Sequence, residues 1–272
     1  VQRASGQRCI SIKACHSIRG GLNGGTLASL LNIAEAGDLD QLADTFLLNP
    51  EGPLPADRSA HADPLAPRHD RDFDAWLAAF VMAAINTRVV RRSAALMPPR
   101  GSPYAPGFVY QETLRTGRGP LGAALAAGMA GGIGVGVVGM RSGVWRAAMR
   151  KLLPAPGEGP SERAMNNGSF RCELIGQSEN GAQARGLIAG RGDPGNRATT
   201  LFVCEAAMAL ANRGEATGAG WFAKPAVPGN RIMVQILRDA GRITPRFPST
   251  SPPWRAILRW PEHRKRRNQG SG

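Results

Sequence analysis

Two short segments of this chain hold side chains whose types and spacing could do chemistry. The first contains Tyr104, Tyr110 and Glu112, and its two tyrosines are the only ones in the sequence. A phenol close to a carboxylate can carry a proton to or from a bound molecule. The sequence leaves a second interpretation open, in which these side chains lie on the half-buried edge of a strand.

The second segment is a run of arginines within a predicted helix. Asn86, Arg88, Arg91 and Arg92 stand in an otherwise apolar frame, and the i,i+4 spacing of Arg88 and Arg92 puts these two on one helix face. Arginines this close together can bind a phosphate or a carboxylate through paired hydrogen bonds. The alternative is a solvated face, or salt bridges within the protein.

A glycine-rich segment, residues 119–140, carries no charged side chain and contains a literal GxGxxG at Gly134, Gly136 and Gly139. That fingerprint binds a dinucleotide only directly after a strand. Here the preceding residues are small and not β-branched, so a chance match is favoured. The segment itself could span a membrane, lie on a lipid surface, or form a buried glycine-rich helix, and its many glycines and alanines favour the buried helix.

The composition excludes several classes of protein. A chain of 272 residues with 42% hydrophobic residues can bury a core, so general disorder is excluded. The net charge is +14, but basic and aromatic residues do not interleave along the body, so no nucleic-acid partner is expected. The four cysteines lack CxxC spacing and the four histidines are dispersed. We therefore predict reduced cysteines, no metal site and a cytoplasmic protein.

Periodicity and turn signals predict the elements that position these residues. A hairpin turn is expected at Glu179-Asn180-Gly181, and Asp193-Pro194 should begin a helix. The predicted fold class is α/β, a mixed sheet with flanking helices. Strands are predicted at 7–15, 108–113, 170–176, 182–189 and near Ile243, helices at 26–34, 39–47, 73–96, 144–152, 193–211 and 230–239, and a long polar loop at 49–72.

Five segments, in order along the chain, resemble the saccharopine dehydrogenase-like oxidoreductases, and in particular their trans-acting enoyl reductase branch. Together they extend over about residues 8–244. The matching segments are RGGLNGGTLAS (19–29), FVMAAINTRVVRRS (80–93), YAPGFVYQE (104–112), LPAPGEGPS (153–161) and GDPGNRATT (192–200).

The resemblance implies an NADP-dependent oxidoreductase. Members of that family begin with a Rossmann nucleotide-binding domain, which this sequence does not contain, so we expect an N-terminally truncated chain that is inactive alone. Three regions are then expected. Residues 1–190 would form a substrate-side α/β domain, 191–247 would be C-terminal helices that pack on the nucleotide domain, and 248–272 would be a basic, disordered tail.

The resemblance also implies the substrate and the site. The substrate would be an acyl or lipid-like chain, carried by a partner protein, and Tyr104, Tyr110 and Arg88 are the candidate catalytic residues. A homo-oligomer and a peripheral contact with a membrane or lipid droplet through 119–140 are further expectations. The alternative function is a non-catalytic module on a membrane or lipid surface. The candidate substrate-binding residues are Gly24, Gly25, Thr26, Asn86, Arg91, Arg92 and Glu112.

Overall fold

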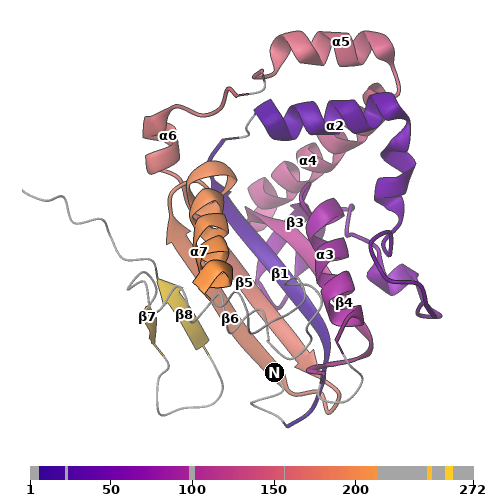
Figure 1. The fold of residues 1–272 in the computed structure, drawn as a ribbon, viewed down its shortest axis with the longest axis vertical. Helices are drawn as coiled ribbons and strands as arrows, with labels where there is room; N and C mark the ends of the chain where they lie inside the picture. The colour runs from indigo at the N-terminus through magenta and orange to yellow at the C-terminus, as the bar shows by residue number, and fades with distance from the viewer. Residues whose placement is uncertain are drawn as a thin grey trace, which may run out of the picture.

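The computed structural model describes residues 6–21, 24–97, 102–155, 157–212, 244–246 and 255–259. The fold is mixed α/β, as predicted, and is built on one sheet with the strand order β2-β3-β4-β1-β5-β6-β8-β7 (Figure 1). The strands are β1 (Cys9–Arg19), β2 (Arg68–Asp70), β3 (Ala75–Ala79), β4 (Tyr104–Gly117), β5 (Ser169–Ser178), β6 (Gln183–Arg191), β7 (Thr244–Arg246) and β8 (Arg255–Arg259).

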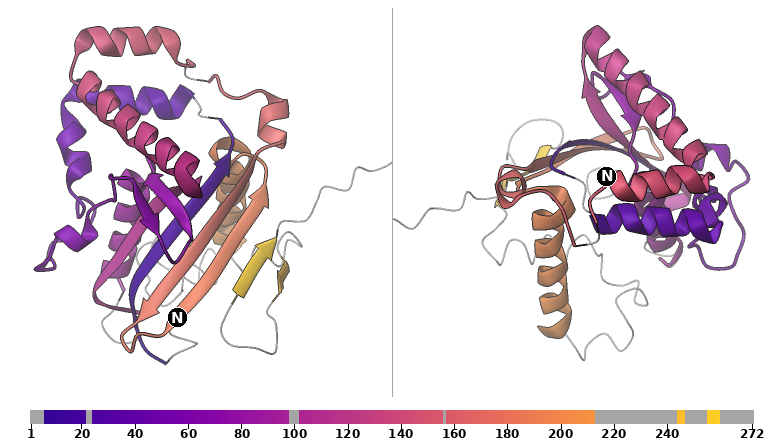
Figure 2. Two further views of the ribbon diagram at one scale, coloured as in Figure 1. Left: turned by 180° about the vertical axis from the view of Figure 1, so that it is seen from behind. Right: turned by 90° about the horizontal axis from the view of Figure 1, so that it is seen from above.

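Helices flank both faces of the sheet. α3 and α7 lie on one face, over β4 and β5, whereas α4 crosses the opposite face (Figures 1 and 2). The helices are α2 (Gly24–Ala36), α3 (Ala83–Ala95), α4 (Gly119–Met140), α5 (Gly143–Leu152), α6 (Glu162–Asn166) and α7 (Thr199–Asn212), with single turns η1 (Asp38–Ala43), η2 (Ser59–His61) and η3 (Pro194–Ala198). The predicted helix at 230–239 lies outside the described residues.

The strand predicted at 7–15 is confirmed and runs on to Arg19 as β1. It occupies the centre of the sheet, parallel to β4 and antiparallel to β5. In this register Ala14 lies beside Glu112 and His16 beside Leu114. Since side chains alternate between the faces of a sheet, His16, Tyr110 and Glu112 come to one face, the face that carries α3 (Figure 1).

The predicted hairpin of β5 and β6 is also confirmed. Gly181 has a φ of 81°, a left-handed conformation that a residue without a Cβ adopts most easily. The side-chain oxygen of Asn180 accepts hydrogen bonds from the Ser178 hydroxyl and the Ala182 amide. The predicted N-cap holds as well, because the Asp193 carboxylate accepts from the backbone amides of Asn196 and Arg197.

The single helix predicted over 73–96 is wrong in its first third. Ala75–Ala79 is strand β3, which pairs with both β2 and β4, and the helix begins only at Ala83. Four of these five strand residues are buried. A fully buried strand shows a continuous apolar run, and such a run cannot be told from a helix by periodicity alone.

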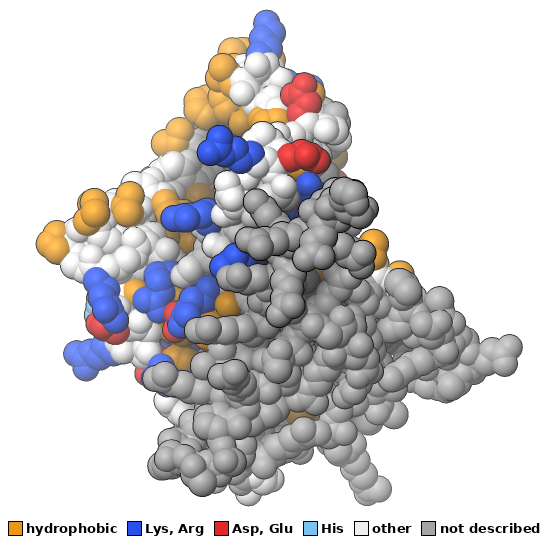
Figure 3. Space-filling model, turned by 90° about the vertical axis from the view of Figure 1, so that its left-hand side faces the viewer, with side chains coloured by type: hydrophobic (Ala, Val, Ile, Leu, Met, Phe, Trp, Pro, Cys, Tyr) orange, Lys and Arg blue, Asp and Glu red, His pale blue; other side chains and the backbone are white. Residues whose placement is uncertain are grey.

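The favoured interpretation of 119–140 as a buried helix is wrong as well. The segment is a helix, α4, but only Gly122 and Ala126 are buried in it. Of the helices in the described residues, α4 is the one long and apolar enough to cross a membrane, with a mean hydropathy of 1.8 and only 11% of that stretch buried. The apolar side chains of α4 include Val138, which is 70% exposed. Figure 3 shows further hydrophobic side chains, drawn in orange, on the surface of one side of the molecule.

Candidate active site

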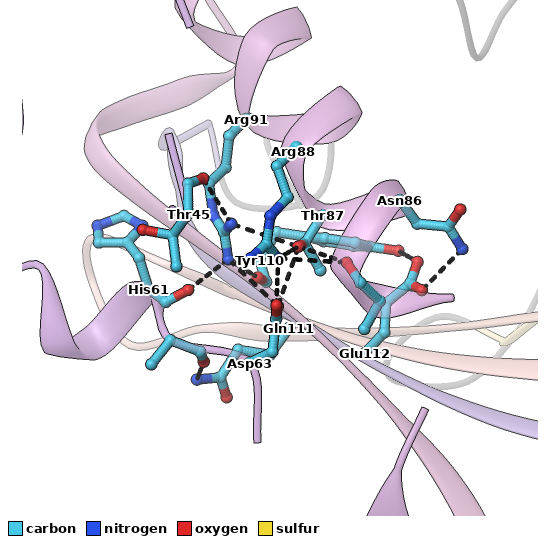
Figure 4. A network of polar contacts seen from close by, with 12 residues as sticks. Thr45, His61, Asp63, Asn86, Thr87, Arg88, Arg91, Tyr110, Gln111 and Glu112 are labelled. Carbon is cyan, nitrogen blue, oxygen red and sulfur yellow. Dashed lines mark hydrogen bonds and ion pairs between the residues drawn. The ribbon is translucent and has the colours of Figure 1, made fainter. Parts of the chain in front are cut away.

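The face of the sheet beneath α3 carries a buried carboxylate, Glu112 on β4. Its Oε1 atom accepts a hydrogen bond of 2.8 Å from the Tyr110 hydroxyl, and its Oε2 atom accepts one of 2.9 Å from the Asn86 amide on α3 (Figure 4). The structure thus brings together three predicted site residues from two elements. Tyr110 and Glu112 meet because residues two apart on a strand share a face.

His16 on β1 completes this cluster. Its Nε2 atom lies 3.7 Å from Oε2 of Glu112, and the two form an ion pair when the imidazole is protonated. The ring stacks on Phe80 with 4.5 Å between the centroids. Nε2 is buried and has no hydrogen-bond partner among the described residues. No local pattern points to His16, because its place beside Glu112 depends on the parallel pairing of two strands far apart in the chain.

Burial and hydrogen bonding set the charges of this cluster. Burial would raise the pKa of Glu112, but His16, Asn86 and Tyr110 lower that pKa below its ordinary value. The pKa of Tyr110 is strongly raised by burial and by the neighbouring Glu112 charge. At neutral pH the cluster therefore holds a carboxylate and an un-ionised phenol. The pKa of the Cys172 thiol, beside His16 on β5, is raised to about 12 by burial and by Glu112, which disfavours its reactive thiolate form at neutral pH.

The predicted arginines on α3 bind backbone carbonyls of the preceding chain segment. Their guanidinium groups are therefore not free to form an open anion-binding site. Arg88 pairs with Asp63 and donates to the carbonyls of Leu42 and Asp44. Figure 4 shows the guanidinium groups of Arg88 and Arg91 within this network. The intraprotein alternative therefore describes Arg88 better than an anion site does.

Arg91 and Arg92 make contacts of the same kind. Arg91 is buried and donates to the carbonyls of Thr45, His61 and Tyr110, and Arg92 donates to the carbonyl of Leu48. Because Arg91 bonds the Tyr110 backbone, it connects this anchored segment with the Glu112 cluster. Arg91 thus helps to position the Tyr110 backbone, and with it the cluster, whereas Arg92 only binds the preceding chain segment.

Gly24, Gly25 and Thr26 begin α2. The described contacts of Gly24 are with Pro154, Ala155 and Glu158 rather than with the Glu112 cluster. The Gly24 amide donates to the carbonyl of Glu158 at 2.9 Å. A Cβ at Gly24 would collide with the Ala155 carbonyl, so the glycine allows two backbone segments to pack closely. A helix N-terminus binds phosphate through its free amides, and here the Gly24 amide is already bonded to the Glu158 carbonyl.

Tyr104 stands apart from the Glu112 cluster, at the start of β4. Its ring packs on Phe108 with 4.4 Å between the centroids, and burial raises its pKa. Tyr104 also lines a cavity below α3. Among the described residues, no three His, Cys, Asp or Glu side chains come together in a way that could hold a metal ion.

The described residues do not fit a dinucleotide. Gly134, Gly136 and Gly139 lie inside helix α4 rather than at a turn between a strand and a helix, and at the start of α2 the Gly24 amide is already bonded to Glu158. No chemical step is therefore assigned to a nicotinamide bound by these residues. The Glu112 cluster can instead hold or move a proton, with protonated His16 as donor and Glu112 as its counter-ion.

The comparisons with known proteins point to one group. The chain is 33% identical over 242 residues to a Mycobacterium tuberculosis protein provisionally named as a trans-acting enoyl reductase, which covers 83% of this chain and 56% of the relative. A trans-acting enoyl reductase of Mycobacterium ulcerans is 35% identical over 180 residues, 61% of this chain and 42% of the relative. One of Mycobacterium bovis is 31% identical over 140 residues, 50% of this chain and 32% of the relative.

No family model matches the chain, and no solved structure matches it. The chain spans about half the length of the curated relatives that it matches. Over most of its own length, this chain is similar to proteins named as trans-acting enoyl reductases.

Proposed function

We propose that this chain is the substrate-side part of a nicotinamide-dependent enoyl reductase that acts on an acyl chain held by a partner protein. The names of the relatives support the reaction class and the partner. NADP as the particular cofactor, and the likeness to saccharopine dehydrogenases, rest on the resemblance of the five sequence segments. Reduction of a carbon–carbon double bond needs a proton donor at the carbon next to the carbonyl, and His16 with Glu112 supplies one.

The observation that carries this proposal is the combination of the buried Glu112 carboxylate with the unpaired Nε2 atom of His16. The carboxylate is fixed by Tyr110 and Asn86, so it can hold the His16 imidazole in place. His16 has no other hydrogen-bond partner for Nε2 among the described residues. That nitrogen is buried beside the Phe80 ring, so a substrate would reach it only after Phe80 moves aside.

Two titrations of the chain test the proposal. The trans-2-decenoyl thioester of N-acetylcysteamine should bind, and Glu112→Gln or His16→Phe should weaken that binding. Glu173→Gln is the matched control, because Glu173 on β5 pairs with Arg115 on the other face of the sheet. Equal binding of the thioester by the wild-type chain and all three variants would show that the Glu112 cluster is not part of the substrate site.

The second titration follows NADPH fluorescence. Since the described residues offer no phosphate cradle, we expect weak binding or none. Tight binding of NADPH by this chain would contradict its assignment to the substrate side of the reductase. The two titrations are independent, so substrate binding without cofactor binding is the expected pattern.

A second candidate function, a peripheral contact with a lipid surface, is favoured by α4. Its N-terminal end is fixed to the sheet, because the Thr116 hydroxyl donates to the Gly122 carbonyl at 2.8 Å. The rest of this apolar helix is exposed, and large exposed apolar patches mark contact surfaces. A helix fixed in this way would lie on a membrane or a lipid droplet rather than cross it.

Flotation with phosphatidylcholine and phosphatidylglycerol vesicles tests this second function. The chain should float with the vesicles, and Val138→Asp should reduce the floated fraction. Val203→Asp on α7 is the control, because Val203 is 62% exposed but lies on the other side of the sheet. Absence of the chain from both kinds of vesicle would exclude the lipid-surface function.

A further inference from the structure

A cavity of about 290 Å³ lies below the C-terminal end of α3, beside the start of β4. It is distinct from the Glu112 cluster, whose four side chains do not line it. Aromatic rings make up much of its wall, among them Phe46, Tyr104 and Phe108. At about 30 Å³ for each small group, this volume holds roughly ten non-hydrogen atoms, which is the size of a small metabolite.

Polar atoms without a hydrogen-bond partner gather in the residues around this cavity. Six buried side-chain nitrogen or oxygen atoms in the described part of the chain lack a partner, and three of them belong to cavity residues, namely Nε of Arg91, Nδ1 of His61 and Oδ1 of Asn49. Arg91 and His61 are almost fully buried, at 3% and 2% exposure. Unpaired buried groups of this kind are uncommon, but these three atoms are themselves covered, so a ligand would reach them only after a local rearrangement of the cavity wall.

The charged side chains that line the cavity are basic. Arg8 and Arg91 both line the cavity, and none of the described lining residues is a carboxylate. Asp63 is the nearest acid to Arg91, at 3.8 Å, and it already pairs with Arg88, while Arg8 pairs with Glu179 outside the cavity. Burial and the Arg91 charge lower the pKa of His61, which leaves its imidazole neutral. The cavity therefore suits an anionic group next to an apolar one.

We propose that this cavity binds a small monocarboxylate with an unbranched apolar tail. The carboxylate would accept charge-assisted hydrogen bonds from Arg8, close to the positive charge of Arg91, whose terminal nitrogens already donate to backbone carbonyls. The tail would pack on Phe46 and Phe108. Tyr104, on the cavity wall, would donate its hydroxyl to the same carboxylate. The proposal does not depend on the reductase function, because it uses a separate cavity and needs no chemical step.

Calorimetric titration of the chain with three molecules of the same tail length tests the proposal. Sodium octanoate has ten non-hydrogen atoms and an anionic head, whereas octan-1-ol is neutral and octylammonium is cationic. Octanoate should bind most tightly, octanol about tenfold more weakly, and octylammonium not at all. Equal or tighter binding of octylammonium would overturn the proposal, because the arginines would then play no part.

Two variants locate the binding. Ala94→Phe fills the cavity and should abolish octanoate binding, whereas Ala148→Phe on the exposed side of α5 should leave it unchanged. Arg8→Gln removes only a surface ion pair, so the fold should persist, and octanoate should bind about threefold more weakly. If Ala94→Phe does not fold, Arg8→Gln decides the question. Wild-type affinity in Arg8→Gln and in a folded Ala94→Phe would place any binding elsewhere and overturn the proposal.

Discussion

The Tyr110 hydroxyl donates a hydrogen bond of 2.8 Å to the buried carboxylate of Glu112, two residues further along the same strand. Asn86 binds the other carboxylate oxygen from the helix above, and His16 approaches it from the neighbouring strand. The carboxylate is thus contacted from three elements. Its ionised state is therefore both a structural requirement and the source of the chemistry that we propose.

Removing the charge of Glu112 should lower stability. In Glu112→Gln the amide oxygen can still accept from Asn86 and the new NH2 group can donate to the Tyr110 hydroxyl, but both hydrogen bonds lose the carboxylate charge. We expect the free energy of unfolding at neutral pH to fall by about 1–2 kcal/mol, the difference between hydrogen bonds to a charged group and to a neutral one. Urea denaturation measures this change. The control Glu173→Gln, in a partly exposed ion pair, should lose less than about 1 kcal/mol.

The low pKa of Glu112 predicts how stability depends on pH. The folded state holds this pKa below its ordinary value, so the unfolded chain binds more protons in the window between the two pKa values. Stability is then fully present above the ordinary glutamate pKa of about 4.3 and is lost as the pH falls through the folded value. Asp70 also has a lowered pKa, held down by Lys13 against the effect of burial, and adds to this loss.

Urea denaturation at a series of pH values between neutrality and strong acid separates the two groups. The wild-type chain should lose stability more steeply with acid than Glu112→Gln does, because the variant keeps only the share of Asp70 and of the exposed carboxylates Glu35, Asp57 and Glu179, whose pKa values are also lowered. Identical slopes for the two proteins would show that Glu112 has an ordinary pKa in the folded state.

Cysteine reactivity should follow burial. Burial raises the pKa of Cys15 to about 11, and burial together with Glu112 raises that of Cys172 to about 12, whereas Cys204 on α7 is exposed. The thiolate is the reactive form. Brief treatment with iodoacetamide at pH 8 should therefore label Cys204 first, as read by peptide mass spectrometry. In urea all the cysteines should react, and equal labelling of Cys172 and Cys204 in the folded chain would contradict the buried cluster.

Local signals in the sequence were sufficient for much of the fold. Alternating residues before His16 indicated β1, Asn180-Gly181 indicated the hairpin, and Asp193-Pro194 indicated a helix start. Each of these features depends on residues close together in the chain. The buried strand Ala75–Ala79 resembles helix in the sequence because its continuous apolar run shows no alternation, and only pairing with β2 and β4 identifies it.

The candidate site could be predicted only in part, for the same physical reason. Tyr110 and Glu112 are neighbours on one strand, so their contact follows from the period of a strand. His16 reaches Glu112 through the pairing of β1 with β4, which joins residues about a hundred positions apart. The roles of Arg88 and Arg91 depend on where the preceding loop folds, which spacing along one helix does not show.

Two glycines offer a test of which close contacts the fold requires. At Gly24 an added Cβ would meet the backbone carbonyls of Pro154 and Ala155, which cannot move aside as a flexible side chain would. Gly24→Ala should therefore reduce the free energy of unfolding by about 3 kcal/mol. Gly132, inside α4, has nothing within 4 Å of its added Cβ, and Gly132→Ala should raise stability by about 0.5–1 kcal/mol, because alanine favours the helix. Urea denaturation of both variants measures the contrast, and a mild effect at Gly24 would mean that the 154–158 segment does not cover the start of α2.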